Sequence, residues 1–187
     1  MKEKITKHSP PYPKGYEPDY IIPEEYCSHR FVLGKIGKNP LVAICMNPSA
    51  ARETSSDSTI NRIIKISRSL GMDGWMVFNI YPERATDATR MEAFNQDLSD
   101  ENTKEIEKYL VKNNIKEVFG AWGDDKNLEA LIKGKQQLLT LLTGLGVKVY
   151  YFGTLTKSGN PRHPLQRQEK WDFSEKKYLE GFVKKSV

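Results

Sequence analysis

Two asparagines stand where apolar runs of the sequence stop, and their carboxamides offer both a hydrogen-bond donor and an acceptor. Asn47 follows the run LVAICM and precedes Pro48 and Ser49, and Asn79 ends the run WMVFN. Asn47 can orient a water molecule or bind a polar ligand edge. Asn79 can pair with an adjacent donor and acceptor, as asparagine does when it reads a nucleobase. The alternatives are structural: a turn-forming Asn before proline, and a cap on the next turn.

The segment from 153 to 166, GTLTKSGNPRHPLQ, carries the strongest concentration of reactive side chains. It contains His163, the only histidine outside the N-terminal region, together with Arg162 and Lys157. An imidazole can donate a proton or stabilise developing negative charge. Arg and Lys side chains suit phosphate. We expect His163 to be functional, with a structural hydrogen-bonding role as the alternative.

Two other short motifs follow apolar runs. Trp122 offers a flat face for stacking and Gly123 allows close backbone approach, although such a tryptophan is more often part of the core. Arg84 and Asp87, in ERATDATR, can form an ion pair beneath the loop after Asn79 or contact a ligand.

The residues before the first helical pattern have two possible roles. In STINRIIKISRSLG the apolar residues fall on one helical stripe, with Asp57 or Ser58 as the N-cap and Gly71 as the stop. Capping is the favoured role of Asp57. If the loop from 47 to 57 folds over a pocket, Asp57 can instead act as a general base, with Thr59 beside it.

Apolar runs and amphipathic stretches alternate along the chain and predict the elements that position these residues. The predicted strands are 30–36, 41–46, 75–79, 115–123 and 147–153, the first two joined as a hairpin by the turn at 37–40. The predicted helices are 58–71, a short helix capped by Asp87, 99–114, 127–146 and 174–185. In the helix 99–114 we expect Ser99 or Asp100 as the cap and Ile106, Leu110 and Val111 on the inward face. The helix 127–146 is expected to be interrupted at Gly134, and Ser174 is expected to cap the last helix.

This alternation predicts an α/β fold: a three-layer α/β/α sandwich around a four-stranded, mainly parallel sheet. Residues 1–24 contain five prolines and are predicted to be an extended N-terminal arm, followed by a single α/β domain from 25 to 187. Ligands of such sheets bind at the carboxyl ends of the strands. Asn47, Asn79, Trp122 and His163 are therefore expected at one edge.

The composition bounds the class of protein. The chain has 187 residues, 38% of them hydrophobic and 28% charged, which is typical of a soluble globular domain. It has no apolar run near the roughly 20 residues that a spanning helix needs and no apolar segment for a secretory signal, so we expect a cytoplasmic protein without a membrane partner. Two cysteines and three scattered histidines form no metal-binding spacing, and neither a metal nor another cofactor is expected.

The net charge of +5 is unevenly distributed. Residues 148–187 contain nine Lys or Arg and four Asp or Glu, so the excess lies in the C-terminal fifth. A basic region suits a polyanion such as nucleic acid, although a solvated lysine-rich surface has the same composition.

The motifs MNPS, DST, FN, RATD, AWG and GNPRHPL occur in one order along the chain. In that order they resemble a family of bacterial and phage proteins known as domain of unknown function 1643, over roughly residues 28 to 166. Gln166 departs from the pattern, in which an aromatic residue is more usual.

More distantly, the same order resembles the uracil-DNA glycosylase superfamily, and this resemblance implies a four-stranded parallel sheet with flanking helices. It also implies that Asn47 positions the attacking water, that Asn79 reads the base edge, and that His163 stabilises charge on the departing base within a loop that enters DNA. The chain departs from that superfamily at 49–52, where Ser-Ala-Ala-Arg includes no aromatic residue, and after His163, where Pro-Leu includes no serine.

These observations predict a protein that recognises a nucleobase or nucleotide and can hydrolyse an N-glycosidic bond by base extrusion. Two alternatives stay open: a non-catalytic binder of nucleic acid or nucleotide, and a small-molecule enzyme acting on nucleotides or sugar phosphates. The substrate and the oligomeric state do not follow from the sequence.

Overall fold

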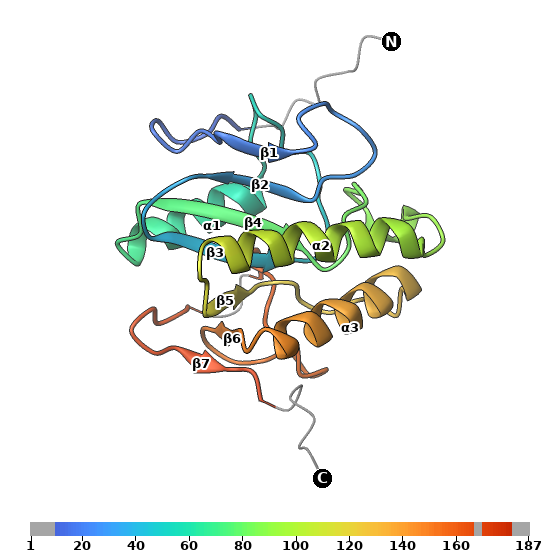
Figure 1. Cartoon of the computed structure of the whole chain (residues 1–187). Helices are drawn as coiled ribbons and strands as arrows, with labels where there is room; N and C mark the ends of the chain where they lie inside the picture. Colours follow the sequence, from blue (N-terminus) through green and yellow to red (C-terminus); the bar gives the residue numbers. More distant parts are fainter. Residues whose placement is uncertain (1–9, 167–169, 181–187) are drawn as a thin grey trace.

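The protein has a mixed β-sheet with helices on both faces (Figure 1). The structure is a computed structural model that describes residues 10–166 and 170–180. The elements are β1 (Tyr20–Ile22), β2 (Val32–Lys35), β3 (Pro40–Cys45), α1 (Ser58–Ser69), β4 (Gly74–Asn79), the 3₁₀ helix η1 (Ala88–Arg90), α2 (Gln96–Lys112), β5 (Glu117–Gly120), α3 (Glu129–Gly144), β6 (Lys148–Tyr151) and β7 (Lys177–Tyr178). No helix among these residues is both long and apolar enough to cross a membrane.

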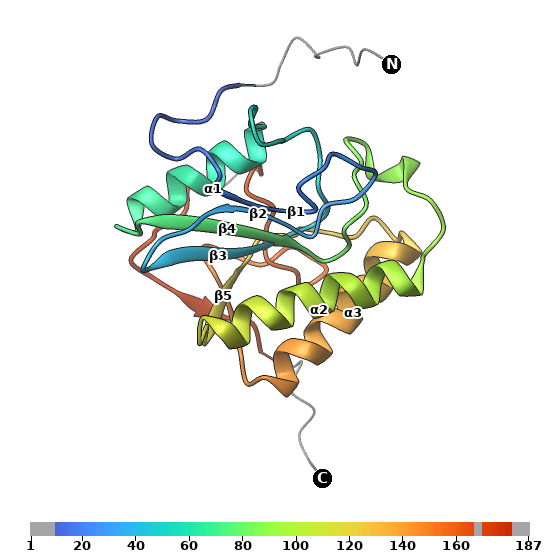
Figure 2. The same cartoon turned by 45° about the horizontal axis from the view of Figure 1, so that its top comes forward.

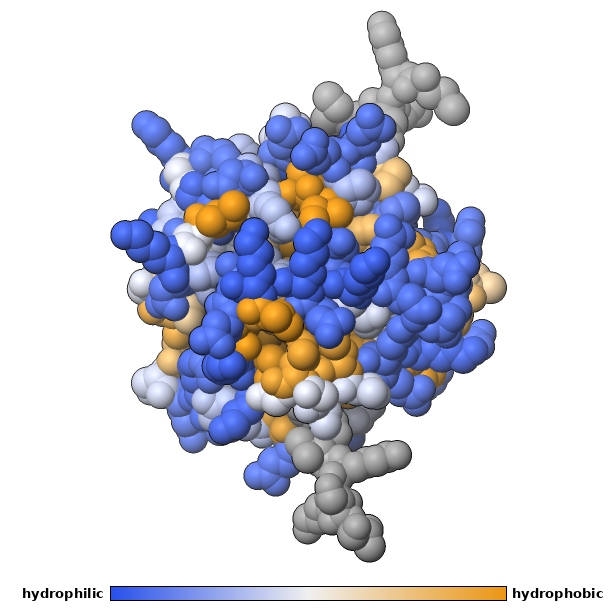
Figure 3. Space-filling model, in the orientation of Figure 1, coloured by the Kyte–Doolittle hydropathy of each residue, from blue (hydrophilic) through white to orange (hydrophobic). Residues whose placement is uncertain are grey.

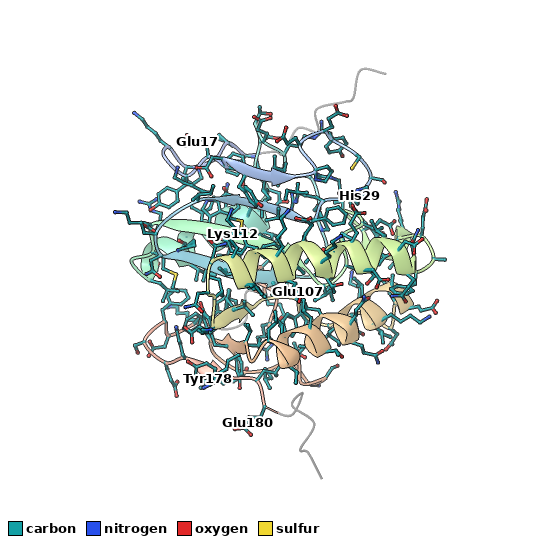
Figure 4. All side chains as sticks on the ribbon, in the orientation of Figure 1. Glu17, His29, Glu107, Lys112, Tyr178 and Glu180 are labelled. Carbon is teal, nitrogen blue, oxygen red and sulfur yellow. The ribbon has the colours of Figure 1, made fainter. Side chains whose placement is uncertain are left out.

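The sheet has seven strands in the order β1-β2-β4-β3-β5-β6-β7. Its central four strands, β4, β3, β5 and β6, are parallel, as predicted. The prediction of a four-stranded sheet was wrong, because β2, β1 and β7 add antiparallel strands at the two edges. Figure 4 shows Glu17 near β1 at one edge and Tyr178 on β7 at the other.

The helices cover the two faces unequally. Figure 2 shows α1 on one face of the sheet and α2 and α3 together on the other. β3 supplies both sides: Val42 and Ile44 belong to the core beneath α2 and α3, whereas Leu41, Ala43 and Cys45 belong to the core beneath α1. Side chains alternate between the faces of a strand, and this is why a doubly covered strand is apolar throughout.

Helix α1 confirms the sequence prediction. Asp57 is its N-cap and accepts a hydrogen bond from the backbone N–H of Ile60, and Gly71 follows the helix with a φ of 67°. Ile60, Ile63 and Ile64 are buried against the sheet. This element places Asp57 beside the carboxyl end of β3.

The predicted hairpin between the first two strands was wrong, because β4 lies between β2 and β3. The turn at 37–40 instead binds the segment that enters β4: the Asp73 carboxylate accepts the N–H groups of Lys38 and Asn39, at 2.9 and 2.7 Å. A Cβ at Gly74 would lie 2.6 Å from the carbonyl oxygen of Lys35, so only glycine fits this approach.

Two predicted helices differ in their bounds. Helix α2 begins at Gln96 with Asn95 as its cap, not at Ser99 or Asp100, because the Asn95 side chain accepts the N–H of Leu98. The two predicted inward residues Ile106 and Leu110 are buried, but Val111 is 62% exposed. The short helix after Asp87 is a single 3₁₀ turn, with Asp87 as its cap.

The predicted C-terminal helix was also wrong over its described part. Residues 177 and 178 form β7 beside β6, while Ser174 donates its N–H to the Asp172 carboxylate in a turn. The Tyr178 hydroxyl donates to Glu117 at 2.9 Å, and Lys176 pairs with the same carboxylate. These partners across the sheet favour a strand over a helix. Residues 181–185 of the prediction lie outside the described residues.

The predicted N-terminal arm contacts the domain where the structure describes it. Tyr12 is buried and stacks on Trp75, with ring centroids 6.1 Å apart, and the carbonyl of Pro10 accepts the N–H of Ser56. Residues 20–22 form β1, and residues 1–9 lie outside the described residues.

Helix α3 continues through Gly134 without the predicted interruption. A Cβ at this position would lie 2.4 Å from the carbonyl oxygen of Ile80, so the glycine allows the helix to lie close to the chain that leaves β4. On the outer surface, Figure 3 shows hydrophobic residues gathered over α3, where Leu139, Leu141 and Leu145 are partly buried.

We predict that Gly134→Ala lowers the free energy of unfolding by about 1–3 kcal/mol, despite the better helix propensity of alanine, because the methyl group overlaps a backbone oxygen. Urea denaturation measures the change. Gly144→Ala in the same helix is the matched control, since a Cβ there would meet nothing within 4 Å, and a gain of up to about 1 kcal/mol is expected. Equal effects at the two positions would contradict the close approach.

Candidate functional site

A pocket of about 750 Å³ lies at the carboxyl end of the central strands. The loops after β3, β4 and β5, the first turn of α1 and the segment after β6 line it. Seven of the residues predicted from the sequence line this pocket: Asn47, Ser49, Asp57, Thr59, Asn79, Gly123 and His163. The convergence of strand ends therefore brings together side chains up to 116 positions apart in the sequence.

Three other predicted residues lie outside the pocket lining. Trp122 is buried in the core, where its Nε1–H donates to the Asn160 side chain at 3.3 Å, so it presents no free face for stacking. Lys157 is exposed beyond the pocket, and Arg162 donates its Nε–H to the carbonyl of Thr154 at 3.1 Å.

Arg84 and Pro48 support the pocket from behind its lining. Arg84 donates from Nη1 to the carbonyl oxygens of Ser49 and Ala51, at 3.1 and 3.0 Å. Asp87, the ion-pair partner considered for Arg84, lies 3.8 Å from Arg90 instead. The carbonyl of Pro48 accepts the N–H of Ala85, which joins the loops after β3 and β4.

The Asn79 side chain is the least satisfied polar group of the pocket. It ends β4 directly beside Cys45 of β3 and is 1% exposed. Neither its Oδ1 nor its Nδ2 has a hydrogen-bond partner among the described protein atoms, although its backbone carbonyl accepts from Asn102 at 3.0 Å. An unpaired buried amide costs about 1–3 kcal/mol, so any group that pairs with this side chain would recover part of that free energy.

Asn47 uses one half of its amide to hold the pocket together. Its Nδ2 donates to the carbonyls of Ala85 and Pro48, at 2.8 and 3.0 Å. These bonds consume its donors and leave Oδ1 as an acceptor in a residue that lines the pocket. Asn47 is therefore both a tie between loops and an acceptor suited to water or ligand.

Asp57 is one of two carboxylates that line the pocket, the other being Asp124. One oxygen accepts the N–H of Ile60 at 2.9 Å, which caps α1, and the other accepts the N–H of Ala51 at 3.2 Å. The second bond folds the loop from 47 to 57 back over the helix end. The capping role is thus present together with a position facing the pocket.

His163 lies against Gly123 in the pocket lining. Gly123 has a φ of 71°, and a Cβ there would lie 3.0 Å from the Cβ of His163, so the glycine makes room for the histidine. The His163 Nδ1 accepts the N–H of Leu165 at 3.3 Å, an arrangement that places the proton of a neutral ring on Nε2. Burial lowers the pKa of His163, Asp57 opposes this shift, and Lys126 adds to it.

Arg30, two residues before β2, also lines the pocket and was not predicted from the sequence. It is 1% exposed, and its Nη1 donates to the carbonyl of Ala51 at 2.8 Å. Burial, and then the neighbouring Arg84, lower the pKa of Arg30 to about 10, while Asp57 raises it. The only signal in the sequence is an arginine directly before the apolar run FVL, and this does not distinguish burial from exposure.

Lys126 is a second missed residue and lies at the exposed rim of the pocket. Lys126 and Asn127 both have left-handed backbone conformations, with φ of 53° and 58°. Such strain in non-glycine residues is frequent at functional sites. Among the described residues, no group of three His, Cys, Asp or Glu side chains could hold a metal ion.

We predict that His163 makes the protein acid-sensitive. Since the pKa of His163 is lowered from 6.5 on folding, the unfolded chain binds the proton first, and stability present above pH 6.5 is lost as the pH falls through the folded pKa. The slope from this one group is at most about 1.4 kcal/mol per pH unit. Urea unfolding between pH 8 and pH 5 should therefore show a smaller loss for His163→Asn. Identical pH profiles for the two proteins would contradict the prediction.

Comparison with known proteins adds a family but no activity. The family described as protein of unknown function (DUF1643) matches residues 30–165, which include every residue of the pocket discussed above. No curated protein and no solved structure matches the chain.

Proposed function

We propose, from the premise that the chain belongs to the DUF1643 family of proteins of unknown function, that its pocket binds a nucleobase or nucleotide and hydrolyses the N-glycosidic bond. The observation that carries the proposal is the Asn79 carboxamide, which is buried in the pocket floor with its donor and its acceptor both unpaired. A ligand that enters this pocket must present a complementary donor and acceptor side by side. The edge of a nucleobase has this pattern.

The size and composition of the pocket support the same ligand class. A volume of about 750 Å³ falls in the range of small-molecule sites and can take a base with its sugar. Its lining mixes apolar groups, such as Val77 and Ile60, with a few polar ones. Apolar walls exclude water from a bound ring, while Asn79 sets its orientation.

The other side chains can perform the hydrolysis. A water molecule that donates a hydrogen bond to Asn47 Oδ1 gives a proton to the Asp57 carboxylate and attacks the anomeric carbon of the sugar as the bond to the base breaks. The electron pair of that bond passes to the base, and the Nε2–H of neutral His163 stabilises the negative charge on a base oxygen. The proton held by Asp57 then passes through solvent to the base anion, and the products are the free base and a sugar with an anomeric hydroxyl. The resemblance to the uracil-DNA glycosylase superfamily implies the same roles for Asn47, Asn79 and His163.

A second candidate is a binder without catalysis. Both oxygens of Asp57 accept backbone N–H groups, and the amide nitrogen of Asn47 is occupied by loop carbonyls. These contacts give Asp57 and Asn47 a structural role that does not depend on catalysis. A small-molecule enzyme that binds phosphate through Lys157 and Arg162 has less support, because these two residues lie outside the pocket lining.

We predict that Asn79→Leu separates binding from folding. Removing two unpaired buried polar atoms should raise the free energy of unfolding by about 1–2 kcal/mol in urea, while thermal stabilisation by nucleobases and nucleosides is lost. The control is Asn102→Leu, which removes the hydrogen bond to the Asn79 carbonyl and should destabilise the protein instead. Unchanged ligand binding by Asn79→Leu would refute the base-reading role.

We predict that His163→Asn decreases base release by about 100- to 1000-fold with little change in binding, because the imidazole acts on charge that develops during the reaction. The assay is release of free base from oligonucleotides and nucleosides that contain uracil, hypoxanthine or alkylated bases. Binding without release from any of them, in the unsubstituted protein, would leave the non-catalytic binder as the function.

A further inference from the structure

We propose that Arg30 is the buried half of an oxyanion subsite in the pocket floor, and that the ligand of this pocket carries a terminal phosphate, as a free nucleotide does. The oxyanion part of this inference stands on Arg30 and its surroundings. The nucleotide part rests on the proposed function.

The hydrogen bonding of Arg30 is incomplete for a buried guanidinium. The side chain has five N–H donors, of which Nη1 reaches the carbonyl of Ala51. Its Nε is buried and has no hydrogen-bond partner among the described protein atoms. A guanidinium presents Nε–H and Nη–H as a planar fork that fits two oxygens of a phosphate. The residue lines the pocket, so an anion in the pocket would lie next to this side chain.

The charges around Arg30 leave an excess of positive charge. Arg84 donates to the same carbonyl of Ala51, which brings a second guanidinium close to the first. Asp57 is the acidic group that raises the pKa of Arg30, but both of its carboxylate oxygens accept backbone N–H groups. Within the described part of the chain, no ion pair joins Asp57 to Arg30. A buried charge without a direct counterion is costly, and a ligand anion would supply one.

The first turn of α1 adds a second favourable feature next to Arg30. Ser58 and Thr59 line the pocket, and N–H groups in the first turn of a helix have no acceptor within it. Together with the partial positive charge of the helix end, these groups favour an anion. Asp57 already occupies part of this helix end, so the subsite depends on Arg30 and not on the helix alone.

The position of Arg30 in the pocket floor favours a terminal phosphate over a phosphate inside a nucleic-acid strand. Arg30 is 1% exposed, whereas Lys126 lies at the exposed rim. A phosphate inside a nucleic-acid strand carries chain on both sides, so two lengths of chain would have to leave from beside the buried Arg30. A terminal phosphate on a small molecule can enter. The structure thus favours a free nucleotide over a base within a strand.

The test is binding of inorganic phosphate, a nucleoside and its 5′-monophosphate at constant ionic strength, measured by calorimetry and by thermal shift against chloride. Arg30→Met removes the fork, and Arg68→Met, on the exposed side of α1, removes an equal charge away from the pocket. We expect phosphate and monophosphate binding to weaken at least about tenfold in Arg30→Met and to stay unchanged in Arg68→Met. Circular dichroism checks that both variants fold.

Each outcome decides one part of the inference. Equal phosphate binding by Arg30→Met and the unsubstituted protein overturns the subsite. A nucleoside that binds as tightly as its 5′-monophosphate also overturns the subsite but leaves base recognition in place. Arg30-dependent phosphate binding without any nucleoside affinity supports the subsite and refutes the proposed base-binding function. Should Arg30→Met fail to fold, Arg30→Lys keeps the charge without the fork. A severalfold loss of phosphate affinity then supports the subsite, and no loss overturns it.

Discussion

The pairing of β3 with β4 holds the pocket in place, and backbone hydrogen bonds between the two segments continue past the ends of both strands. The ladder ends at Cys45 opposite Asn79, but the N–H of Ile80 still donates to Cys45 and that of Tyr81 to Met46. Beyond these, the side chain of Asn47 bonds to the carbonyl of Ala85. Because parallel strands carry all their carboxyl ends to one edge, this extended pairing fixes two walls of the pocket relative to each other.

The same edge is where the protein tolerates unfavourable burial. The amide of Asn79 and the Nε of Arg30 are both enclosed without protein partners, and Lys126 and Asn127 have left-handed backbones nearby. Single unpaired buried atoms also occur outside the pocket lining, on Asn61, Arg62, Arg84, Asn102 and Trp171. Other buried polar groups are satisfied: Asn160 bonds to Asp124, Lys135 and Trp122, and Ser67 donates to the carbonyl of Gly74. Among the described residues, only Asn79 has both a buried side-chain donor and a buried side-chain acceptor without a partner, and this supports a binding function at the edge.

Much of the fold could be predicted because its signals are local. The buried central strands are continuous apolar runs, and α1 combines a capping Asp57 with an apolar stripe and a terminal Gly71. Errors occurred where a distant partner decides the structure. The expected hairpin failed because β4 enters between β2 and β3, and the expected C-terminal helix failed because β6 offers an open edge and Glu117 binds Lys176 and Tyr178.

The candidate site divides in the same way. The sequence by itself determined that Asn47 and His163 follow strands, that Asn79 ends one, and that all three meet at one edge, since apolar runs separated by helices indicate parallel strands, whose carboxyl ends share an edge. Only the tertiary structure decided that Trp122 lies in the core, that Arg30 lies in the pocket floor, and that Asn79 is unpaired. Burial and hydrogen bonding of a side chain depend on atoms contributed by remote segments, and no pattern within the segment itself specifies them.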